Sequence, residues 1–271
     1  MTNSTQTQQN TNKGFFDSIL YANQARINSI RTIKTKGKSY FALSITLMTI
    51  NNNGKKSYTS LEVNARGEKV NQILNTFSDE FPNRNDQKYW IADIAIGSLK
   101  SDIYYSKKYN CYKSQLKGRL IQINSLTIEG KAIFGEPATN NHSVLVAQAY
   151  INTIDMENKK AKASILDGLI SSPEYHTIKL DFNEITEFDE LDKEGLCPRG
   201  FDYRDQNAKI YGIFEIENIR SYVYQYKEEA LSCLKGNLTK VRYLKANDTV
   251  ITSKSTLKKA ANDFEQGHLS A

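Results

Sequence analysis

Tyrosine and lysine are interleaved through residues 104–113, where the chain reads YYSKKYNCYK. Tyrosine rings can stack on unpaired bases, at about 1–3 kcal/mol per base, while lysines follow the phosphates. The competing interpretation is that tyrosine is a good strand residue and lysine protects a sheet edge. That interpretation is the stronger one for any single tyrosine. For the segment as a unit, the pattern favours contact with a single-stranded nucleic acid.

Other basic and aromatic residues of the first half extend this candidate surface. A basic turn near residue 36 and the strand after residue 113 supply the cations. A lone tryptophan, Trp90, is a candidate stacking platform, although a Trp at a strand start is more often in the core. The predicted nucleic-acid-binding residues are Arg31, Lys34, Lys36, Lys38, Tyr58, Trp90, Tyr104, Tyr105, Lys107, Lys108, Tyr109, Tyr112, Lys113, Lys117 and Arg119.

The second half carries a different aromatic pattern. Tyr222, Tyr224 and Tyr226 recur at a spacing of two and therefore share one face of a strand. This face can be a stacking surface or a hydrophobic interface with another protein. The loop that follows, 227–229, is not basic, and an acidic copy would repel phosphates. The second half is therefore expected to pack against the first or to meet a protein.

Signatures of enzymes, metals and cofactors are missing from the sequence. It contains no GxxxxGK[ST] phosphate loop, no HExxH and no GxSxG. The three cysteines are widely spaced, and the acidic run 184–194 is typical of a solvated helix and loop rather than of a metal site. We predict a non-enzymatic protein with no cofactor and no metal.

Charge is divided unevenly along the chain. Residues 1–135 hold 19 Lys and Arg against 9 Asp and Glu, a balance of +10, whereas residues 136–271 hold 17 against 21, a balance of −4. A basic half favours a polyanionic partner, so the first half is the predicted binding half. The apolar runs are too short to span a membrane, and the cysteine pattern suits a reducing cytoplasm.

Two sequence motifs occur twice, in the same order. The motif SQLKGRL begins at Ser114 and returns as SCLKGNL at Ser232, an offset of 118. Upstream, ARINSI at Ala25 returns as AYINTI at Ala149, an offset of 124. The period is far longer than that of solenoid or propeller repeats, so each copy should have its own core. We interpret the chain as a duplicated domain.

The elements of each copy predict one small barrel fold. In the first copy, strand-like alternation over 24–33, 40–50 and 55–64 precedes a helical pattern over 66–77 and two long strands over 88–106 and 112–128. Five strands with a helix after the third is the element order of the oligonucleotide/oligosaccharide-binding (OB) barrel. The second copy repeats the order with weaker signals. The fold class is therefore mainly β, with two tandem OB-like five-stranded barrels.

The predicted domain boundaries follow the same patterns. A polar, low-complexity leader over 1–13 is expected to be disordered. The first, basic domain covers 14–134, a linker rich in Gly, Pro and Asn covers 135–143, and the diverged acidic domain covers 144–251. A polar tail covers 252–271.

Several short segments of the first copy resemble a known bacterial family. They are GFFD at 14–17, KGK at 36–38, YFALSI at 40–45, IAIGSL at 94–99 and LKGRLIQI at 116–123. The family consists of replication proteins of integrative and conjugative elements, and its domain is formally of unknown function. The resemblance covers about residues 14–134. Members of that family end soon after the last of these segments, whereas this chain continues into a second copy.

Together these observations predict a cytoplasmic single-stranded DNA-binding protein that serves replication or processing of a mobile element. RNA is an alternative ligand, because discrimination by the 2′-hydroxyl is a matter of geometry. Replication or conjugation proteins are the expected protein partners, and no membrane is expected to be involved. The sequence leaves the oligomeric state open. The alternative function is a protein-interaction scaffold that uses the tyrosine-rich face of the second domain. A third is a barrel that recognises a small molecule or sugar.

Overall fold

The structure of the 271-residue chain is a computed structural model. It describes residues 15–16, 18–35, 38–50, 56–82, 89–198, 209–247 and 249–251, without the side chains of 15, 16, 38 and 50. The predicted leader, the predicted tail and Lys36 lie outside the described residues, as does the side chain of Lys38.

Strands make up most of the described chain. The strands of the first half are β1 (Phe15–Phe16), β2 (Ile19–Thr35), β3 (Lys38–Ile50), β4 (Lys56–Ala65), β5 (Trp90–Ser106), β6 (Cys111–Ile128) and β7 (Lys131–Phe134). Those of the second half are β8 (Ser143–Asp155), β9 (Lys160–Leu169), β10 (Ser172–Phe182), β11 (Ile210–Tyr226), β12 (Glu229–Ala246) and β13 (Thr249–Val250). The helices are α1 (Glu68–Thr76), the 3₁₀ turn Ser78–Glu80 and α2 (Thr186–Lys193).

In the described part of the first half, five strands close into a barrel in the order β2, β3, β4, β6 and β5. The ring closes because β5 pairs with β2. All neighbouring strands are antiparallel except β4 and β6, which run parallel, and α1 follows β4. This is the topology expected of an OB barrel, so the predicted fold class is confirmed.

The second half closes in the same way. Within its described residues, β8, β9, β10, β12 and β11 form a ring, with the parallel pair at β10 and β12. The acidic run 184–194, typical of a solvated helix and loop, contains the helix α2, which lies between β10 and β11 along the chain. Phe188 and Leu191 of α2 are fully buried against the barrel, because their spacing of three places them on one face of the helix.

The repeated Leu-Lys-Gly motif has a packing explanation. Gly118 and Gly236 occupy equivalent places on β6 and β12, since each lies beside the third strand of its barrel. A Cβ on Gly118 would lie 2.5 Å from Cγ2 of Ile96, and one on Gly236 would lie 2.6 Å from Cγ2 of Ile216. Both barrels therefore require a residue without a side chain here, because packed interiors leave no room for an added methyl group.

The repeated Ile-Asn motif marks a bulge in the first strand of each barrel. The register of β2 shifts between Ile27 and Ser29, and that of β8 shifts between Ile151 and Thr153. In each case the asparagine between them donates a hydrogen bond to a hydroxyl of the second strand. The two bonds are Asn28 Nδ2 to Thr46 Oγ1 at 2.9 Å and Asn152 Nδ2 to Ser164 Oγ at 2.8 Å.

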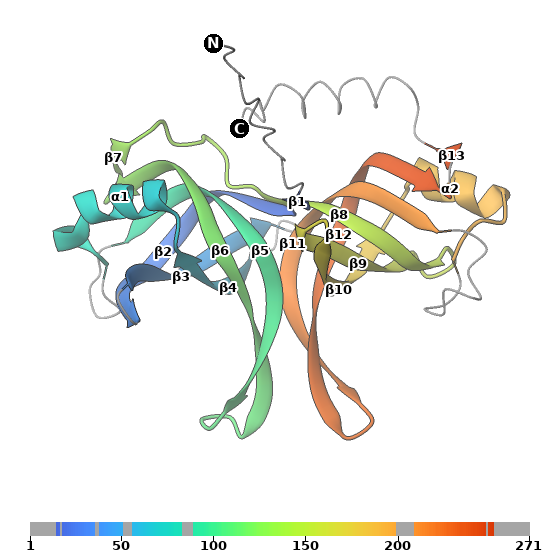
Figure 1. The fold of residues 1–271 in the computed structure, drawn as a ribbon, viewed down its shortest axis with the longest axis horizontal. Coiled ribbons are helices and arrows are strands. Elements are labelled where there is room, and N and C mark those ends of the chain that lie inside the picture. The colour runs from blue at the N-terminus through green and yellow to red at the C-terminus, as the bar shows by residue number, and fades with distance from the viewer. Residues whose placement is uncertain are drawn as a thin grey trace, which may run out of the picture.

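The two barrels are joined by hydrogen-bonded strands as well as by the linker. β2 pairs with β8 in antiparallel register, from Ile19 opposite Val146 to Ala22 opposite Ser143. β1, which the sequence analysis assigned to the first domain, pairs instead with β9 of the second. Figure 1 shows the barrels side by side, with two long hairpins projecting in the same direction between them.

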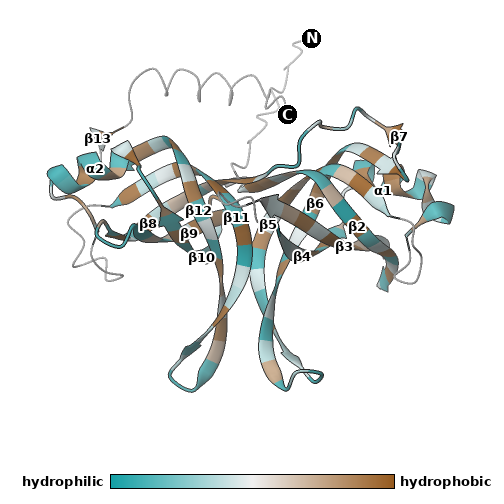
Figure 2. Ribbon diagram, turned by 180° about the vertical axis from the view of Figure 1, so that it is seen from behind, coloured by the Kyte–Doolittle hydropathy of each residue, from teal (hydrophilic) through white to brown (hydrophobic). Residues whose placement is uncertain are grey.

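Apolar residues alternate with polar ones along the strands, and the alternation is visible as brown and teal segments in both barrels (Figure 2). The inward set forms a continuous core that crosses from one barrel to the other. Trp90 belongs to this core. Its side chain is 0% exposed and meets the rings of Phe77 and Phe81 edge-on, at 6.5 and 5.8 Å between ring centroids.

Candidate nucleic-acid interface

The segment 104–113 forms the end of the β5–β6 hairpin. A bulge at Gly97–Lys100 precedes it, with Ser98 in the left-handed region at φ 51°, so β5 bends before leaving the barrel. Gly97 lies at that irregularity. Beyond it the hairpin runs in unbroken register to Ser106 opposite Cys111. Figure 1 shows the hairpin extending well clear of the barrel, so both of its faces are accessible near the tip.

The hairpin tyrosines are exposed. Tyr105, Tyr109 and Tyr112 are 50%, 58% and 55% exposed, and Tyr104 is 42% exposed. Tyr105 and Tyr112 are a cross-strand pair whose rings meet at 74° with centroids 5.3 Å apart. The Tyr105 hydroxyl also donates to Oδ1 of Asn110 in the turn. These contacts hold the rings in place while leaving their outer faces open.

The hairpin lysines lie beside these rings. The Nζ atom of Lys113 lies 3.3 Å from the ring centroid of Tyr109, and that of Lys108 lies 5.3 Å from it. Lys107 and Lys108 are exposed in the turn. An ammonium over an aromatic face is attracted by about 0.5–1 kcal/mol at an exposed site. The structure therefore combines aromatic faces and cations within one projecting hairpin.

The other predicted basic residues lie apart from the hairpin tip. Arg31 forms an ion pair with Glu62, and Lys34 is exposed at the end of β2, which Figure 1 places on the outer side of the barrel. Lys117 Nζ pairs with Asp102 Oδ2 at 2.6 Å, and Arg119 is exposed further along β6. Exposed ion pairs contribute little to stability, so these cations remain able to exchange partners.

Two predicted aromatic contacts have different outcomes. The prediction that Trp90 is a stacking platform is wrong. Its indole is fully buried against Phe77 and Phe81 and has no face open to a ligand. Tyr58, in contrast, is 65% exposed on β4. It has a counterpart in the second barrel: Tyr175 on β10 is 59% exposed and lies three residues before Ile178, as Tyr58 lies three residues before Leu61.

The tyrosines of the second hairpin lie on one face, as their spacing predicted. The rings of Tyr222 and Tyr224 are parallel within 7°, with centroids 6.3 Å apart. Lys179 of β10 reaches across to both, and its Nζ atom lies 4.8 Å from each centroid. Tyr226 is 59% exposed near the turn. β11 and β12 contact β5 and β6, so the two hairpins are neighbours.

The sequence analysis missed a group of lysines on the second barrel. Lys160, Lys162, Lys179 and Lys235 come from three different strands and line one groove together with Tyr222. One signal was available in the sequence, because Lys235 is the lysine of the repeated Leu-Lys-Gly motif. The other three have no such marker, and the net acidity of the second half hides them.

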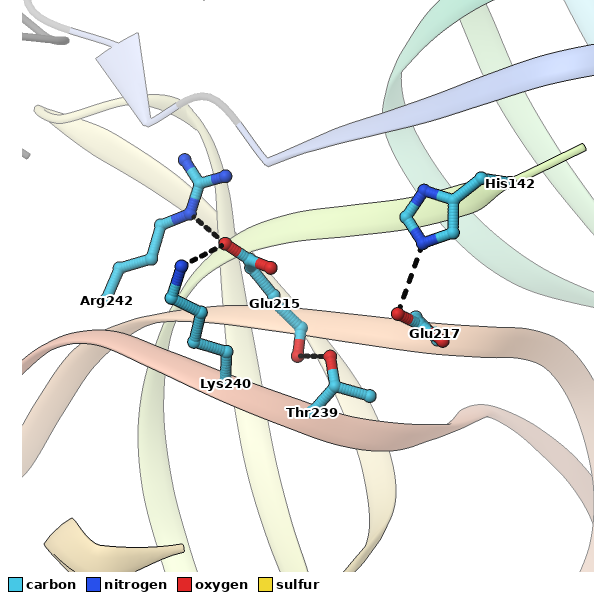
Figure 3. Close-up of polar contacts among 6 residues, drawn as sticks. All are labelled: His142, Glu215, Glu217, Thr239, Lys240 and Arg242. Atoms are coloured by element: carbon cyan, nitrogen blue, oxygen red, sulfur yellow. Dashed lines mark hydrogen bonds and ion pairs between the residues drawn. The ribbon is translucent and has the colours of Figure 1, made fainter. Parts of the chain in front are cut away.

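Carboxylates on another part of the second barrel are already paired. Glu215 Oε1 of β11 accepts from Arg242 Nε at 2.7 Å and lies 3.5 Å from Lys240 Nζ, and Glu217 Oε1 lies 3.2 Å from His142 Nε2 (Figure 3). Thr239 donates to the Glu215 carbonyl at 3.2 Å. Part of the negative charge that distinguishes the second half is therefore balanced locally by cations of the same barrel.

No group of three or more His, Cys, Asp or Glu side chains in the described ranges is arranged to hold a metal ion. Among the same residues, no helix is both long enough and apolar enough to cross a membrane.

The fold and these surfaces define a mainly β protein with two barrels of OB topology and exposed aromatic residues on both hairpins. Residues 14–142 match the model of a family described as "Protein of unknown function (DUF3577)". The match ends one residue before β8, so it covers the first barrel and the linker. No curated protein matches the chain.

Solved structures of similar shape include the wild-type single-stranded DNA binding protein from Thermus aquaticus and a deletion mutant of it. The wild-type protein is 7% identical, with 84% of this chain and 92% of that chain covered and a TM-score of 0.38. The mutant is 9% identical, with 84% and 93% covered and the same TM-score of 0.38.

Proposed function

We propose that the protein binds single-stranded nucleic acid, with DNA as the physiological ligand, and that the β5–β6 hairpin is the principal contact. The observation that supports this most directly is the exposure of Tyr105, Tyr109 and Tyr112 beside Lys108 and Lys113. Exposed rings can stack on unpaired bases of any sequence, and the adjacent ammonium groups can pair with phosphates.

The mode of action that follows is binding without chemistry. The ligand would lie along the projecting hairpin, where bases reach the tyrosine faces and phosphates reach Lys107, Lys108 and Lys113. The basic residues Arg31, Lys34, Lys117 and Arg119 would extend the contact along the first barrel. The resemblance of residues 14–134 to replication proteins of integrative and conjugative elements suggests the setting: a cytoplasmic protein that protects or presents unwound strands of a mobile element.

The test is a fluorescence-anisotropy titration of labelled oligo-dT with the full chain at several salt concentrations. Release of condensed counterions makes log K fall with log salt, by about 0.7 per phosphate contact on single strands. We expect the triple variant Lys107→Ala, Lys108→Ala, Lys113→Ala to bind more weakly and with a flatter slope. A triple variant of exposed lysines elsewhere in the first half, Lys56→Ala, Lys69→Ala and Lys131→Ala, controls for net charge.

Several outcomes would overturn the proposal. If the wild-type chain shows no salt-dependent binding to oligo-dT, the proposed function is wrong. If the hairpin and control triples lose affinity equally, binding reflects net charge rather than this hairpin. Tighter binding to oligo-U than to oligo-dT would identify RNA as the ligand. Retention of a replication or conjugation protein without any strand binding would favour the scaffold that uses Tyr222, Tyr224 and Tyr226.

A further inference from the structure

The two barrels carry equivalent grooves with different linings. The groove of the first barrel has a volume of about 770 Å³ and that of the second about 810 Å³. Ser29, Ile30 and Arg31 line the first, and Thr153, Ile154 and Asp155, at the offset of 124 found in the repeated motif, line the second. Because the grooves are similar in size and place, any difference in what they bind must come from their side chains.

The charges of the linings do not follow the net charges of the two halves, because the lining of the basic half is balanced and that of the acidic half has more cations than anions. Across from the repeated lysine of the terminal strand, the first barrel has Glu62 and the second has Lys179. Glu62 is paired with Arg31, so the charged residues lining the first groove compensate each other. The second groove instead gathers four lysines, contributed by β9, β10 and β12: Lys160, Lys162, Lys179 and Lys235.

Three carboxylates line the second groove, Asp155, Glu157 and Asp181; Glu157 is exposed in the β8–β9 turn, and the other two have local partners. Asp155 accepts hydrogen bonds from the backbone N and the Nδ2 of Asn158, at 2.9 and 2.8 Å, which stabilise the β8–β9 turn. Asp181 Oδ2 pairs with Lys235 Nζ at 2.8 Å. Four lysines against three carboxylates leave the lining with an excess of positive charge. Burial raises the pKa of the Cys233 thiol, and the positive charges of Lys179 and Lys162 partly oppose this rise.

Aromatic faces border this cationic groove. Tyr222 lines it, and the parallel ring of Tyr224 lies next along β11. Lys179 Nζ lies 4.8 Å from the centroid of each ring, so one cation is held beside two stacking faces. On β10, Tyr175 shares the outward face with Lys179, because residues four apart on a strand point to the same side. Phosphate-binding and base-stacking groups are thus combined here.

We infer that the groove between the β8–β9 turn and the β11–β12 hairpin is a second site for single-stranded DNA, despite the net negative charge of its domain. This inference rests on the proposed function and extends it: one strand would contact the first hairpin and this groove. Lys160, Lys162 and Lys179 bind its phosphates, and Tyr222 and Tyr224 stack on its bases. The strand footprint then spans both barrels.

The experiment uses the full chain and labelled oligo-dT of about 32 nucleotides, enough for two barrels at about 4–16 nucleotides each. The groove variant is Lys160→Gln, Lys162→Gln and Lys179→Gln. The control variant removes the same charge from lysines of the same domain that do not line the groove, Lys193→Gln, Lys209→Gln and Lys240→Gln. We expect the groove variant to lower affinity and to flatten the salt slope by up to about 2, at about 0.7 per phosphate contact. The control variant should keep more of the affinity and more of the salt dependence than the groove variant.

A second measurement does not depend on mutation. Photo-crosslinking of an oligonucleotide that contains 5-iododeoxyuridine, followed by mass spectrometry, should label the peptide that holds Tyr222 and Tyr224 as well as the β5–β6 hairpin. Equal behaviour of groove and control variants, with crosslinks confined to the first hairpin, overturns this inference and leaves the proposed function intact. Absence of any wild-type binding to oligo-dT overturns both.

Discussion

Leu20 of β2 and Leu145 of β8 face each other across the junction of the two barrels, and both are 0% exposed. Each also pairs with an equivalent isoleucine of its own barrel, Leu20 with Ile96 and Leu145 with Ile216. The two leucines therefore occupy equivalent positions in the two copies of the fold, and these equivalent positions pair with each other. An approximate two-fold axis passes between them, as in the self-complementary interface of a symmetric dimer.

Truncation of either leucine should weaken both barrels. We expect Leu20→Ala and Leu145→Ala each to lower the free energy of unfolding by about 2–5 kcal/mol, the usual cost of this change in a core. Val144→Ala, on the neighbouring half-buried position of β8, should cost less. Urea denaturation measures all three. A cost for Leu145→Ala no larger than for Val144→Ala would show that the junction contributes little to stability.

Gly118 should not tolerate a side chain. Gly118→Ala is expected to cost about 1–3 kcal/mol, the typical penalty for overpacking, because its Cβ would lie 2.5 Å from Ile96 Cγ2 and 3.2 Å from the Gly97 carbonyl oxygen. Gly97→Ala is the matched control, since a Cβ there would lie at an ordinary 3.6 Å from Ile121. Thermal melts of the two variants compare them directly. Equal melting temperatures would contradict the packing explanation of the repeated motif.

Aromatic and cationic residues of the hairpin should affect binding in different ways. Changing Tyr105, Tyr109 and Tyr112 to Ala should weaken binding by about 1–3 kcal/mol for each stacked base. The salt slope should stay nearly intact, because stacking releases no counterions. The matched triple Tyr→Phe variant keeps the rings and should keep the affinity.

The same variants separate binding from folding. The Tyr105–Tyr112 pair contributes about 0.2–1 kcal/mol as a cross-strand contact, so the Ala variant should melt only slightly lower. Circular dichroism gives the melting transition of the Ala variant, and anisotropy is then measured at a temperature below that transition, where the variant is folded. Unchanged affinity in the folded Ala variant would exclude the hairpin rings as a stacking surface.

His176 should make stability depend on pH. Burial lowers its pKa from the usual 6.5, and this effect outweighs the opposing influence of Asp167 and Glu174, while Lys100 adds to it. The unfolded chain therefore takes up a proton at a higher pH than the folded chain does. The resulting stability is fully present above about pH 6.5 and is lost as the pH falls toward the lowered pKa.

The measurement is the melting temperature of wild type and His176→Gln at several pH values at and below 6.5. The wild type should lose stability on acidification more steeply than the variant. His142→Gln, which removes a more exposed histidine paired with Glu217, is the control. Parallel curves for wild type and His176→Gln would contradict the assignment.

Much of the fold was predictable because its determinants are local. Alternation of apolar residues over 40–50 depends on the period of a strand, and the spacing of Val70 and Leu74 depends on the period of a helix. The two repeated motifs were also visible without coordinates. They recur because each barrel needs a glycine beneath an isoleucine of its fourth strand and an asparagine at the bulge of its first. The tyrosine-rich hairpin was found in the same way, since its candidate residues are contiguous.

The remaining features depend on which distant residues meet, and no local pattern encodes that. From the sequence, Trp90 can be either a stacking platform or a core residue. Only its packing against Phe77 and Phe81 in the folded chain decides for the core. The pairing of β1 with β9 joins residues far apart in the chain. The groove lysines are separated by 75 positions between Lys160 and Lys235, and only the parallel contact of β10 with β12 brings them to one surface. A domain can therefore be acidic in sum and basic in its groove, because net charge adds all residues whereas a binding surface is composed only of those that the fold places side by side.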